Sequence, residues 1–340
     1  MRSPLLLATC LIGLSVFDST RVDAGLPEPE SSRLPYTVDQ SAAMLVARSN
    51  LIVEATVLDL KPIPVVQGMG CRWMSEIWLQ PTRQLWGVID DPKFKIITEG
   101  VSPDQEGDLP PGCRVAHNSE EEPPPAVGES GIFLLSTGSW QLVEGERTLN
   151  LPSVSMGFLP KRQDGNASVS IRTLRYMWPY EEIVSAIERR ASSLSIESLM
   201  SLADAIFVGT GTLRGALWTV DVENVYRGHV DDPFSILFPF DAIGSDPELA
   251  TQAMLVSELA WRLQQRTGNR FLIFARKQGN SWLPVDHGVL TVVGGNRVQV
   301  QARLHEGKVG WSESILSDIE PILRGNLKAA RSKAPADRKE

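Results

Sequence analysis

Residues 49–56 read Ser-Asn-Leu-Ile-Val-Glu-Ala-Thr, and residues 203–210 read Ala-Asp-Ala-Ile-Phe-Val-Gly-Thr. Each stretch contains a run of mostly β-branched and apolar residues, which predicts a buried strand. The two stretches lie 154 residues apart. Because self-similarity at a long fixed distance is the signature of a repeated structural unit, they predict that one module occurs twice in the chain.

Three more matches follow in the same order along the chain, at a distance of 140 or 141 residues. They are the aromatic pair Trp78 and Trp86 with Trp218 and Tyr226, the tripeptide Asp-Asp-Pro at 90–92 with 231–233, and the apolar runs at 128–135 with 268–275. The tripeptide is a turn signal, so we expect it to connect two strands in each copy.

A short helical pattern precedes the first strand of each copy. In the first copy, Thr37 and Gln40 have the spacing of a capping box before an apolar stretch. In the second copy, Ser195 is a suitable N-cap before Ile196 and Leu199. Both copies are therefore expected to begin with a helix.

Each copy also ends in apolar residues at helical spacing. The first such pattern opens at Trp178 and runs through Arg190, and the second opens at Trp311 and runs through Leu323. We expect an amphipathic helix at the end of each copy, opened by a tryptophan in both cases.

The strands between these helices predict a sheet with one face in solvent. Residues 217–225 alternate apolar with polar side chains, the period of a half-buried strand, and this favours antiparallel pairing. The long connections differ between the copies. Residues 99–127 are acidic and rich in Pro and Gly, which predicts a loop, whereas residues 241–267 contain a helix start at Asp246.

The order of these patterns resembles the netrin-like modules and the tissue inhibitors of metalloproteinases. The residues that carry the resemblance are 203–210, Val-Tyr-Arg-Gly at 225–228, and Gly-Asn-Arg-Phe-Leu-Ile-Phe at 268–274. The resemblance implies an OB-type five-stranded barrel packed against helices. With the duplication, it predicts a mainly β fold of the α+β class. Two tandem OB-like five-stranded antiparallel barrels are expected, each with a short amino-terminal helix and a carboxy-terminal amphipathic helix.

The inhibitors in this family grip the catalytic zinc of a protease through a mature amino-terminal cysteine. The first residues of this chain instead resemble a signal peptide, with a basic start, an apolar run at 4–17 and the small residues Val22 and Ala24 at positions −3 and −1. Cleavage after Ala24 would leave Gly25 at the amino terminus, so no inhibitory residue is carried over from the family.

Two alternatives to a cleaved signal peptide are weaker. The apolar run is shorter than the roughly 20 residues of a membrane anchor. A lipoprotein would use Cys10, which leaves too short an apolar region before it. We therefore expect a secreted or periplasmic protein, divided into a signal peptide at 1–24, a flexible linker at 25–35, a first OB/netrin-like module at 36–192, a second at 193–325 and a disordered basic tail at 326–340.

Cleavage would remove Cys10 and leave two thiols, Cys71 and Cys113. In an oxidising compartment they are expected to form a disulfide with each other. Two separate buried thiols are the alternative. Two cysteines are too few for a thiolate zinc site, and these two do not form a Cys-x-x-Cys redox pair.

The formal net charge of −8 argues against nucleic acid as a partner, because phosphate binding depends on clustered Lys and Arg. No stretch after residue 24 is apolar for long enough to span a bilayer as a helix. The expected partner is therefore another extracytoplasmic protein or a glycan, and no stable membrane span is predicted.

Catalytic and metal-binding signals are weak in this sequence. The four histidines, His117, His229, His287 and His305, have no metal-ligand spacing. Neither a nucleophile elbow nor a phosphate-binding glycine loop occurs. The acidic run at 120–122 lacks the alternating spacing of a calcium loop. We predict no catalytic residue, no bound metal and no cofactor.

Other local signals point to structure or to the surface. Residues 294–296 (Gly-Gly-Asn) predict a hairpin turn, and Asn166 begins a glycosylation sequon. Most of the nine tryptophans recur between the copies, which favours roles in the core. Trp73 and Trp261 recur less clearly and are the candidates for surface binding, although core packing is the more ordinary role of such residues.

Together these signals predict an exported, non-catalytic binding protein of two OB-like modules. One alternative is an inhibitor that binds a secreted protease through its loops. The other is a carbohydrate-binding or hydrolytic protein. Hydrolysis would need carboxylates that converge in a cleft, such as Asp231, Asp232 and Glu223.

Overall fold

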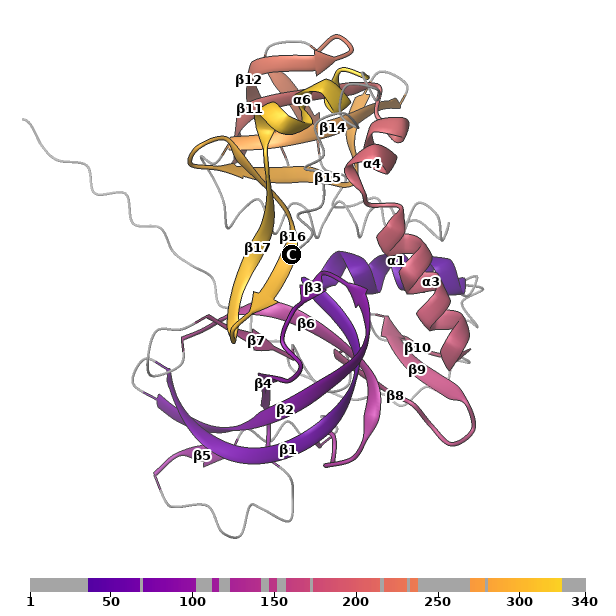
Figure 1. The fold of residues 1–340 in the computed structure, drawn as a ribbon, viewed down its shortest axis with the longest axis vertical. Coiled ribbons are helices and arrows are strands. Elements are labelled where there is room, and N and C mark those ends of the chain that lie inside the picture. The colour runs from indigo at the N-terminus through magenta and orange to yellow at the C-terminus, as the bar shows by residue number, and fades with distance from the viewer. Residues whose placement is uncertain are drawn as a thin grey trace, which may run out of the picture. The chain divides into compact units, whose positions relative to one another are not determined.

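The computed structural model describes residues 36–67, 70–101, 112–115, 123–141, 147–151, 157–171, 174–214, 217–230, 233–237, 270–278 and 281–325. Strands dominate these residues, as Figure 1 shows, and the α+β class is confirmed. The helices within the described part are α1 (Val38–Arg48), α3 (Tyr180–Ser192), α4 (Ile196–Leu202) and α6 (Leu316–Leu323). No helix in the described ranges has the length and apolar character needed to cross a bilayer.

The first sheet is built from strands of the first half of the chain, of which β1, β2 and β6 are long. Its members are β1 (Leu51–Gln67), β2 (Gly70–Trp86), β4 (Phe94–Glu99), β5 (Arg114–Val115), β6 (Ser130–Gln141), β7 (Arg147–Asn150) and β8 (Phe158–Pro160). The strands follow the order β1-β2-β4-β7-β6-β8, and β1 pairs with β6 as well as with β2. Strands β4 and β7 are parallel, and β5 adds to β2. A separate antiparallel pair consists of β9 (Asn166–Ile171) and β10 (Leu174–Pro179).

The second sheet follows the order β13-β12-β11-β14-β15-β16-β17. Its strands are β11 (Ala205–Arg214), β12 (Leu217–Arg227), β13 (Phe234–Leu237), β14 (Arg270–Gln278), β15 (Ser281–Val293), β16 (Arg297–His305) and β17 (Lys308–Ile315). The short strand β3 (Val88–Ile89) joins this sheet at β16. Within the described residues the sheet stays open, because no pairing returns from β17 to β13. The predicted pair of tandem five-stranded antiparallel barrels is therefore not observed.

The strand registers recur between the two sheets at the distances found in the sequence. Leu51 pairs with Leu135 in the first sheet, and Ala205 pairs with Ala275 in the second, which are shifts of 154 and 140 residues. Irregularities recur as well. The β1–β2 ladder shifts its register after Ile52 and after Glu54, and the β11–β12 ladder shifts after Ile206 and after Val208. Because bulges bend a strand, both sheets bend at equivalent positions.

The helix starts follow local capping chemistry. The Thr37 side chain accepts a bond from the Gln40 backbone while the Gln40 side chain accepts one from Thr37, so the predicted capping box is confirmed. Ser195 caps α4 as predicted. The hairpin predicted at 294–296 is also confirmed, because Val293 pairs with Arg297.

One helix boundary was predicted wrongly. The tryptophan that was expected to open the last helix lies in strand β17, where Trp311 pairs with Ala302, and α6 begins only at Leu316. The apolar spacing alone did not reveal that a full β-hairpin precedes the helix. Trp178 also lies in a strand, β10, where it pairs with Ala167, but α3 begins only two residues later, at Tyr180.

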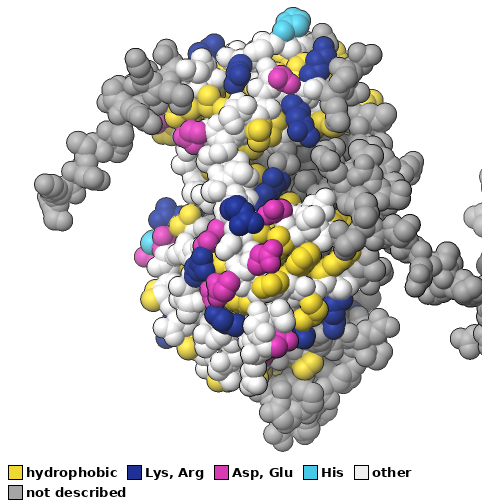
Figure 2. All heavy atoms as spheres, turned by 90° about the vertical axis from the view of Figure 1, so that its right-hand side faces the viewer, with side chains coloured by type: hydrophobic (Ala, Val, Ile, Leu, Met, Phe, Trp, Pro, Cys, Tyr) yellow, Lys and Arg dark blue, Asp and Glu magenta, His cyan; other side chains and the backbone are white. Residues whose placement is uncertain are grey.

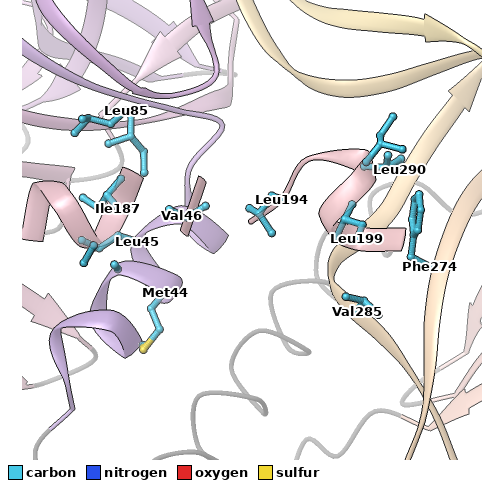
Figure 3. Packing of buried hydrophobic residues seen from close by; sticks show 14 of the residues in the cluster. Met44, Leu45, Val46, Leu85, Ile187, Leu194, Leu199, Phe274, Val285 and Leu290 are labelled. Carbon is cyan, nitrogen blue, oxygen red and sulfur yellow. The ribbon is translucent and has the colours of Figure 1, made fainter. Parts of the chain in front are cut away.

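The buried side chains form separate clusters. The first-sheet core is lined by residues such as Leu51, Ile77 and Ile96, and the second-sheet core by residues such as Phe207 and Trp218. A third cluster, the helix-side core, joins α1 and α3 to α4 and the second sheet. Figure 3 shows part of this cluster, from Met44, Leu45 and Val46 on α1 to Leu199 on α4 and Phe274 on β14.

Candidate functional site

The β16–β17 hairpin carries residues of the second sheet into the first-sheet core. Ala302 and Leu304 of β16 are 1% and 2% exposed and belong to that core, and Trp311 of β17 packs against it. Strand β3 pairs in parallel with the same strand, through Val88 with Arg303 and Ile89 with Leu304. The hairpin thus belongs to the second sheet and packs into the first-sheet core, and its contact with the β3 region is the candidate functional site.

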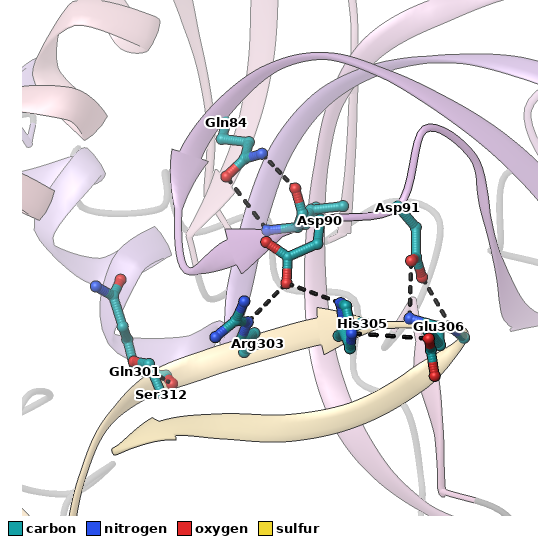
Figure 4. A network of polar contacts seen from close by, with 10 residues as sticks. Gln84, Asp90, Asp91, Gln301, Arg303, His305, Glu306 and Ser312 are labelled. Carbon is teal, nitrogen blue, oxygen red and sulfur yellow. Dashed lines mark hydrogen bonds and ion pairs between the residues drawn. The ribbon is translucent and has the colours of Figure 1, made fainter. Parts of the chain in front are cut away.

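The turn of this hairpin is held by a carboxylate from the first half of the chain. Glu306 and Gly307 form the turn and have φ values of +50° and +71°. Their successive backbone N–H groups both donate to Asp91, at 2.8 Å each (Figure 4). Neighbouring N–H groups that converge in this way form a nest for an anion, and here the Asp91 carboxylate occupies it.

Asp90, next in the chain, binds the side chains of the hairpin. Arg303 Nε donates to Asp90 Oδ2 at 2.6 Å, and His305 Nδ1 lies 3.2 Å from the same oxygen (Figure 4). The hydrogen bond from Arg303 lowers the pKa of Asp90 and outweighs the opposing effect of burial, and the charges of Arg303 and His305 lower the pKa further. Asp90 therefore stays ionised in the folded chain to a lower pH than an ordinary aspartate.

The segment before these carboxylates is fixed by Gln84 and Gly87. The Gln84 amide binds both backbone groups of Ile89, at 2.5 and 3.2 Å. Gly87 has a φ of +81°, and a Cβ at this position would lie 2.1 Å from Leu51 Cδ2 and 3.2 Å from the carbonyl oxygen of Ala302. Only glycine fits this backbone conformation and this close approach of β16 without rearrangement.

A second polar cluster fixes α3 on the first sheet. Arg83 of β2 makes a two-pronged bond to Glu188 of α3, at 2.7 and 2.8 Å. Lys161 lies 3.7 Å from Glu54 and 4.9 Å from the centre of the Tyr180 ring. On the face drawn in Figure 2, basic and acidic side chains are interspersed with hydrophobic ones. This cluster holds the helix in place through matched charges.

Tyr180 is the buried member of that cluster. Its side chain is 1% exposed, and its hydroxyl has no hydrogen-bond partner of acceptable geometry among the described residues. Burial raises the pKa of Tyr180, and the neighbouring Glu54 carboxylate raises it further. The phenol is therefore neutral over the whole physiological range.

The predicted surface-binding tryptophans do not form an exposed site in the described residues. Trp73 is 7% exposed and lies on β2, so its ring is not offered to solvent. Trp261 lies outside the described residues, as do the acidic run at 120–122 and the predicted helix in 241–267. The predicted pairing of Cys71 with Cys113 is confirmed by a disulfide whose Cα atoms are 4.6 Å apart.

The residues of the hydrolytic alternative are only partly described. Asp231 and Asp232 lie outside the described residues. Glu223 accepts bonds from Thr210 and Arg270 on the second sheet. In the part of the chain that the structure covers, no group of three or more His, Cys, Asp and Glu side chains is placed to hold a metal ion.

Within the described residues, the histidines do not come together in one site. His229 is exposed after β12, His287 lies in β15, and His117 falls outside the described residues. His305 lies in the hairpin contact, where it meets Asp90 of the first Asp-Asp-Pro copy. From the sequence, that tripeptide was expected to form an ordinary turn, because nothing in it indicates a contact with residues more than 200 positions away.

The large hydrophobic side chains that are exposed among the described residues share one property: none is aromatic. They are Leu58, Val127, Met177, Leu202, Leu217 and Ile315. Leu58 and Val127 belong to segments that the hydrogen bond from Gly128 N to Val57 O holds together on the first sheet.

Comparison with known proteins adds no assignment: no protein-family model matches the chain, and no curated protein matches its sequence.

Proposed function

We propose that the chain is an exported, non-catalytic binding protein whose two OB-like modules together recognise another extracytoplasmic protein. The hairpin contact is the observation that carries this proposal. Asp90 and Asp91 bind side chains and backbone of β16 and its turn, while Ala302 and Leu304 complete the first-sheet core. Two sheets coupled in this way offer a pre-organised surface, which lowers the entropic cost of binding.

The pairing order supports an OB-like arrangement of the first module. Strand β1 pairs with β2, and the order continues through β4, β7 and β6, which pairs again with β1. OB-folds are partly open five-stranded barrels that bind ligands on one face and through neighbouring loops. The second module shares the order β4-β2-β1-β6 of the first as β13-β12-β11-β14.

The exposed apolar side chains favour a protein over a glycan as the partner. Glycan sites stack sugars on exposed aromatic rings, whereas the exposed large hydrophobic residues of the described chain are aliphatic residues and one methionine. Such side chains suit contacts with another protein surface.

Two features support export. The sequence of residues 1–24 has the order of a signal peptide, with a basic start, an apolar run and small residues before the expected cleavage after Ala24. The disulfide between Cys71 and Cys113 is of a kind that persists in oxidising compartments.

The test uses the whole chain from Gly25 onwards, because the hairpin of the second sheet completes the core of the first. The chain is coupled to a support and incubated with the native extracytoplasmic fraction, and captured proteins are purified and titrated against it by calorimetry. We expect one protein to bind with saturation, and to bind at least tenfold more weakly to Asp90→Ala/Asp91→Ala, which loosens the hairpin contact.

The matched control is Asp221→Ala, which removes an exposed carboxylate of β12 outside the contact. Equal affinity of all three chains would contradict a role for the coupled modules in recognition. Turnover of a substrate by the purified chain, lost in a folded point variant, would overturn the non-catalytic function itself.

A further inference from the structure

Three polar side chains lie close together where β2 and β4 run alongside each other, near the disulfide. Ser75 of β2 is the direct partner of Thr98 of β4. Trp73 stands two residues before Ser75 on the same strand and two residues after Cys71. On neighbouring strands, a direct partner and its diagonal neighbour are within reach of an aromatic side chain.

All three side chains belong to the face of the sheet that carries the first-sheet core. Side chains alternate between the faces of a strand, and the β2–β4 register runs without a shift from Met74 to Leu79. Ile77 on β2 and Ile96 on β4 lie in the first-sheet core. Ser75 and Trp73 share the face of Ile77, and Thr98 shares the face of Ile96.

Two of the three side chains are buried with a polar atom that the described residues leave without a partner. Trp73 is 7% exposed and Thr98 is 1% exposed. Neither the indole Nε1 of Trp73 nor the hydroxyl of Thr98 forms a hydrogen bond with any described residue. Folded proteins rarely bury such groups without a partner, because the lost bonds to water are not replaced.

The third side chain already has one bond. The Ser75 hydroxyl donates to the carbonyl oxygen of Gly100 at 2.9 Å, so its oxygen can still accept. Trp73 can only donate, and Thr98 can donate or accept. An oxygen that accepts from Trp73 and exchanges a bond with Thr98 would satisfy both buried groups.

Among the described residues, the neighbours of these groups on this face are uncharged. The neighbouring charged residues, Arg72 and Glu99, alternate to the opposite face and lie 4.0 Å from each other. A charged ligand bound here would lose its hydration without gaining a counter-charge, so its binding would be unfavourable. A neutral ligand has no charge that needs such a partner. The burial of Trp73 and Thr98 also restricts the ligand to a small size.

We propose that Trp73, Ser75 and Thr98 form a buried site for a small uncharged molecule that presents an oxygen acceptor. That oxygen belongs either to an internal water or to the hydroxyl or carbonyl group of a small organic ligand. The site goes beyond the proposed function, since it holds whether or not the chain binds another protein.

The first experiment observes the indole N–H of Trp73 by nuclear magnetic resonance in the full ¹⁵N-labelled chain, assigned by its loss in Trp73→Phe. Two probes distinguish the sources of the oxygen. Magnetisation transfer from a long-lived water to this N–H identifies an internal water. A saturable shift of the same resonance on titration with N-methylacetamide identifies a site open to organic ligands. Absence of both responses would overturn the proposal.

The second experiment measures the equilibrium constant of unfolding in urea. If both groups bind one oxygen, Trp73→Phe and Thr98→Val each weaken folding about tenfold, and the double variant is also only about tenfold weaker instead of a hundredfold. Thr219→Val on the second sheet is the control for the loss of a threonine hydroxyl. If the groups bind nothing, Thr98→Val leaves folding unchanged or strengthens it, and the loss of packing in Trp73→Phe simply adds to that effect in the double variant, which contradicts the proposal.

Discussion

Asp90 and Arg303 are joined by a hydrogen bond of 2.6 Å between Oδ2 and Nε although 213 residues separate them in the chain. The next residue, Asp91, accepts hydrogen bonds from the turn that follows β16, the strand of Arg303. Two adjacent acidic residues thus recognise one hairpin in two ways, one through its side chains and the other through its backbone.

Loss of the Asp91 carboxylate should weaken the whole fold. Asp91→Ala leaves the N–H groups of Glu306 and Gly307 to water in place of a charged acceptor, and we expect the free energy of unfolding to fall by about 1–2 kcal/mol. Urea denaturation followed by tryptophan fluorescence measures this change. Asp221→Ala serves as the control, and an equal effect of the two substitutions would show that the turn contact contributes nothing.

A methyl group at Gly87 should be poorly tolerated. Gly87→Ala combines a φ of +81° with a Cβ 2.1 Å from Leu51 Cδ2, so we expect a loss of about 2–4 kcal/mol in the free energy of unfolding. Gly310→Ala on β17 is the matched control, because a Cβ there meets nothing within 4 Å. Thermal unfolding of both variants checks the difference, and similar melting temperatures would refute the steric argument.

Acid should remove the contribution of Asp90. Its pKa in the folded chain lies below the ordinary value of 3.8, because Arg303 donates a hydrogen bond to the ionised form. The stabilisation is therefore present above pH 3.8 and is lost as the pH falls through the lowered pKa of the folded state. The difference in the free energy of unfolding between the natural chain and Asp90→Asn should shrink between pH 5.5 and pH 2.5. A difference independent of pH would contradict this account.

Alkaline conditions should reveal the buried phenol of Tyr180. Burial, followed by the Glu54 charge, raises its pKa in the folded chain above the ordinary value of 10.0. Stability is therefore complete below pH 10 and falls as the pH rises further, since the unfolded chain ionises first. The stability of Tyr180→Phe should fall less than that of the natural chain between pH 10 and pH 11. Parallel curves for the natural chain and Tyr180→Phe would contradict the prediction.

Reduction of the disulfide should destabilise the chain from Gly25 onwards, in which Cys71 and Cys113 are the remaining thiols. With a sequence separation of 42 between the two cysteines, loop entropy gives a loss of about 4 kcal/mol as an upper figure. Urea denaturation with and without reductant measures it. The double variant Cys71→Ser/Cys113→Ser should match the reduced chain and should not respond to reductant.

Local signals in the sequence predicted the local structure well. Thr37 and Gln40 cap α1 in the predicted way, and the matched runs at 49–56 and 203–210 form equivalent parts of β1 and β11. These features depend on residues that are neighbours in the chain or on a repeated pattern, and both are visible in one sequence.

Features that depend on distant contacts could not be predicted in the same way. Trp311 stands before a helical pattern, but its pairing with Ala302 and its contact with the first-sheet core place it in a strand. Trp73 has no clear counterpart in the second copy, which suggested a position on the surface. The structure instead buries it where β2 pairs with the short strand β5. The roles of Asp90 and Asp91 likewise depend on a hairpin far along the chain.

The shared hairpin also has a consequence for the order of events during synthesis. The ribosome makes the strands of the first sheet long before it makes residues 297–315, yet Ala302 and Leu304 fill the core of that sheet. The nascent first module therefore keeps an unfilled apolar surface around Leu51 and Ile89 until the last part of the chain arrives. A chaperone that covers this surface in the meantime would raise the yield of folded protein, and slow translation of the second half would lower it.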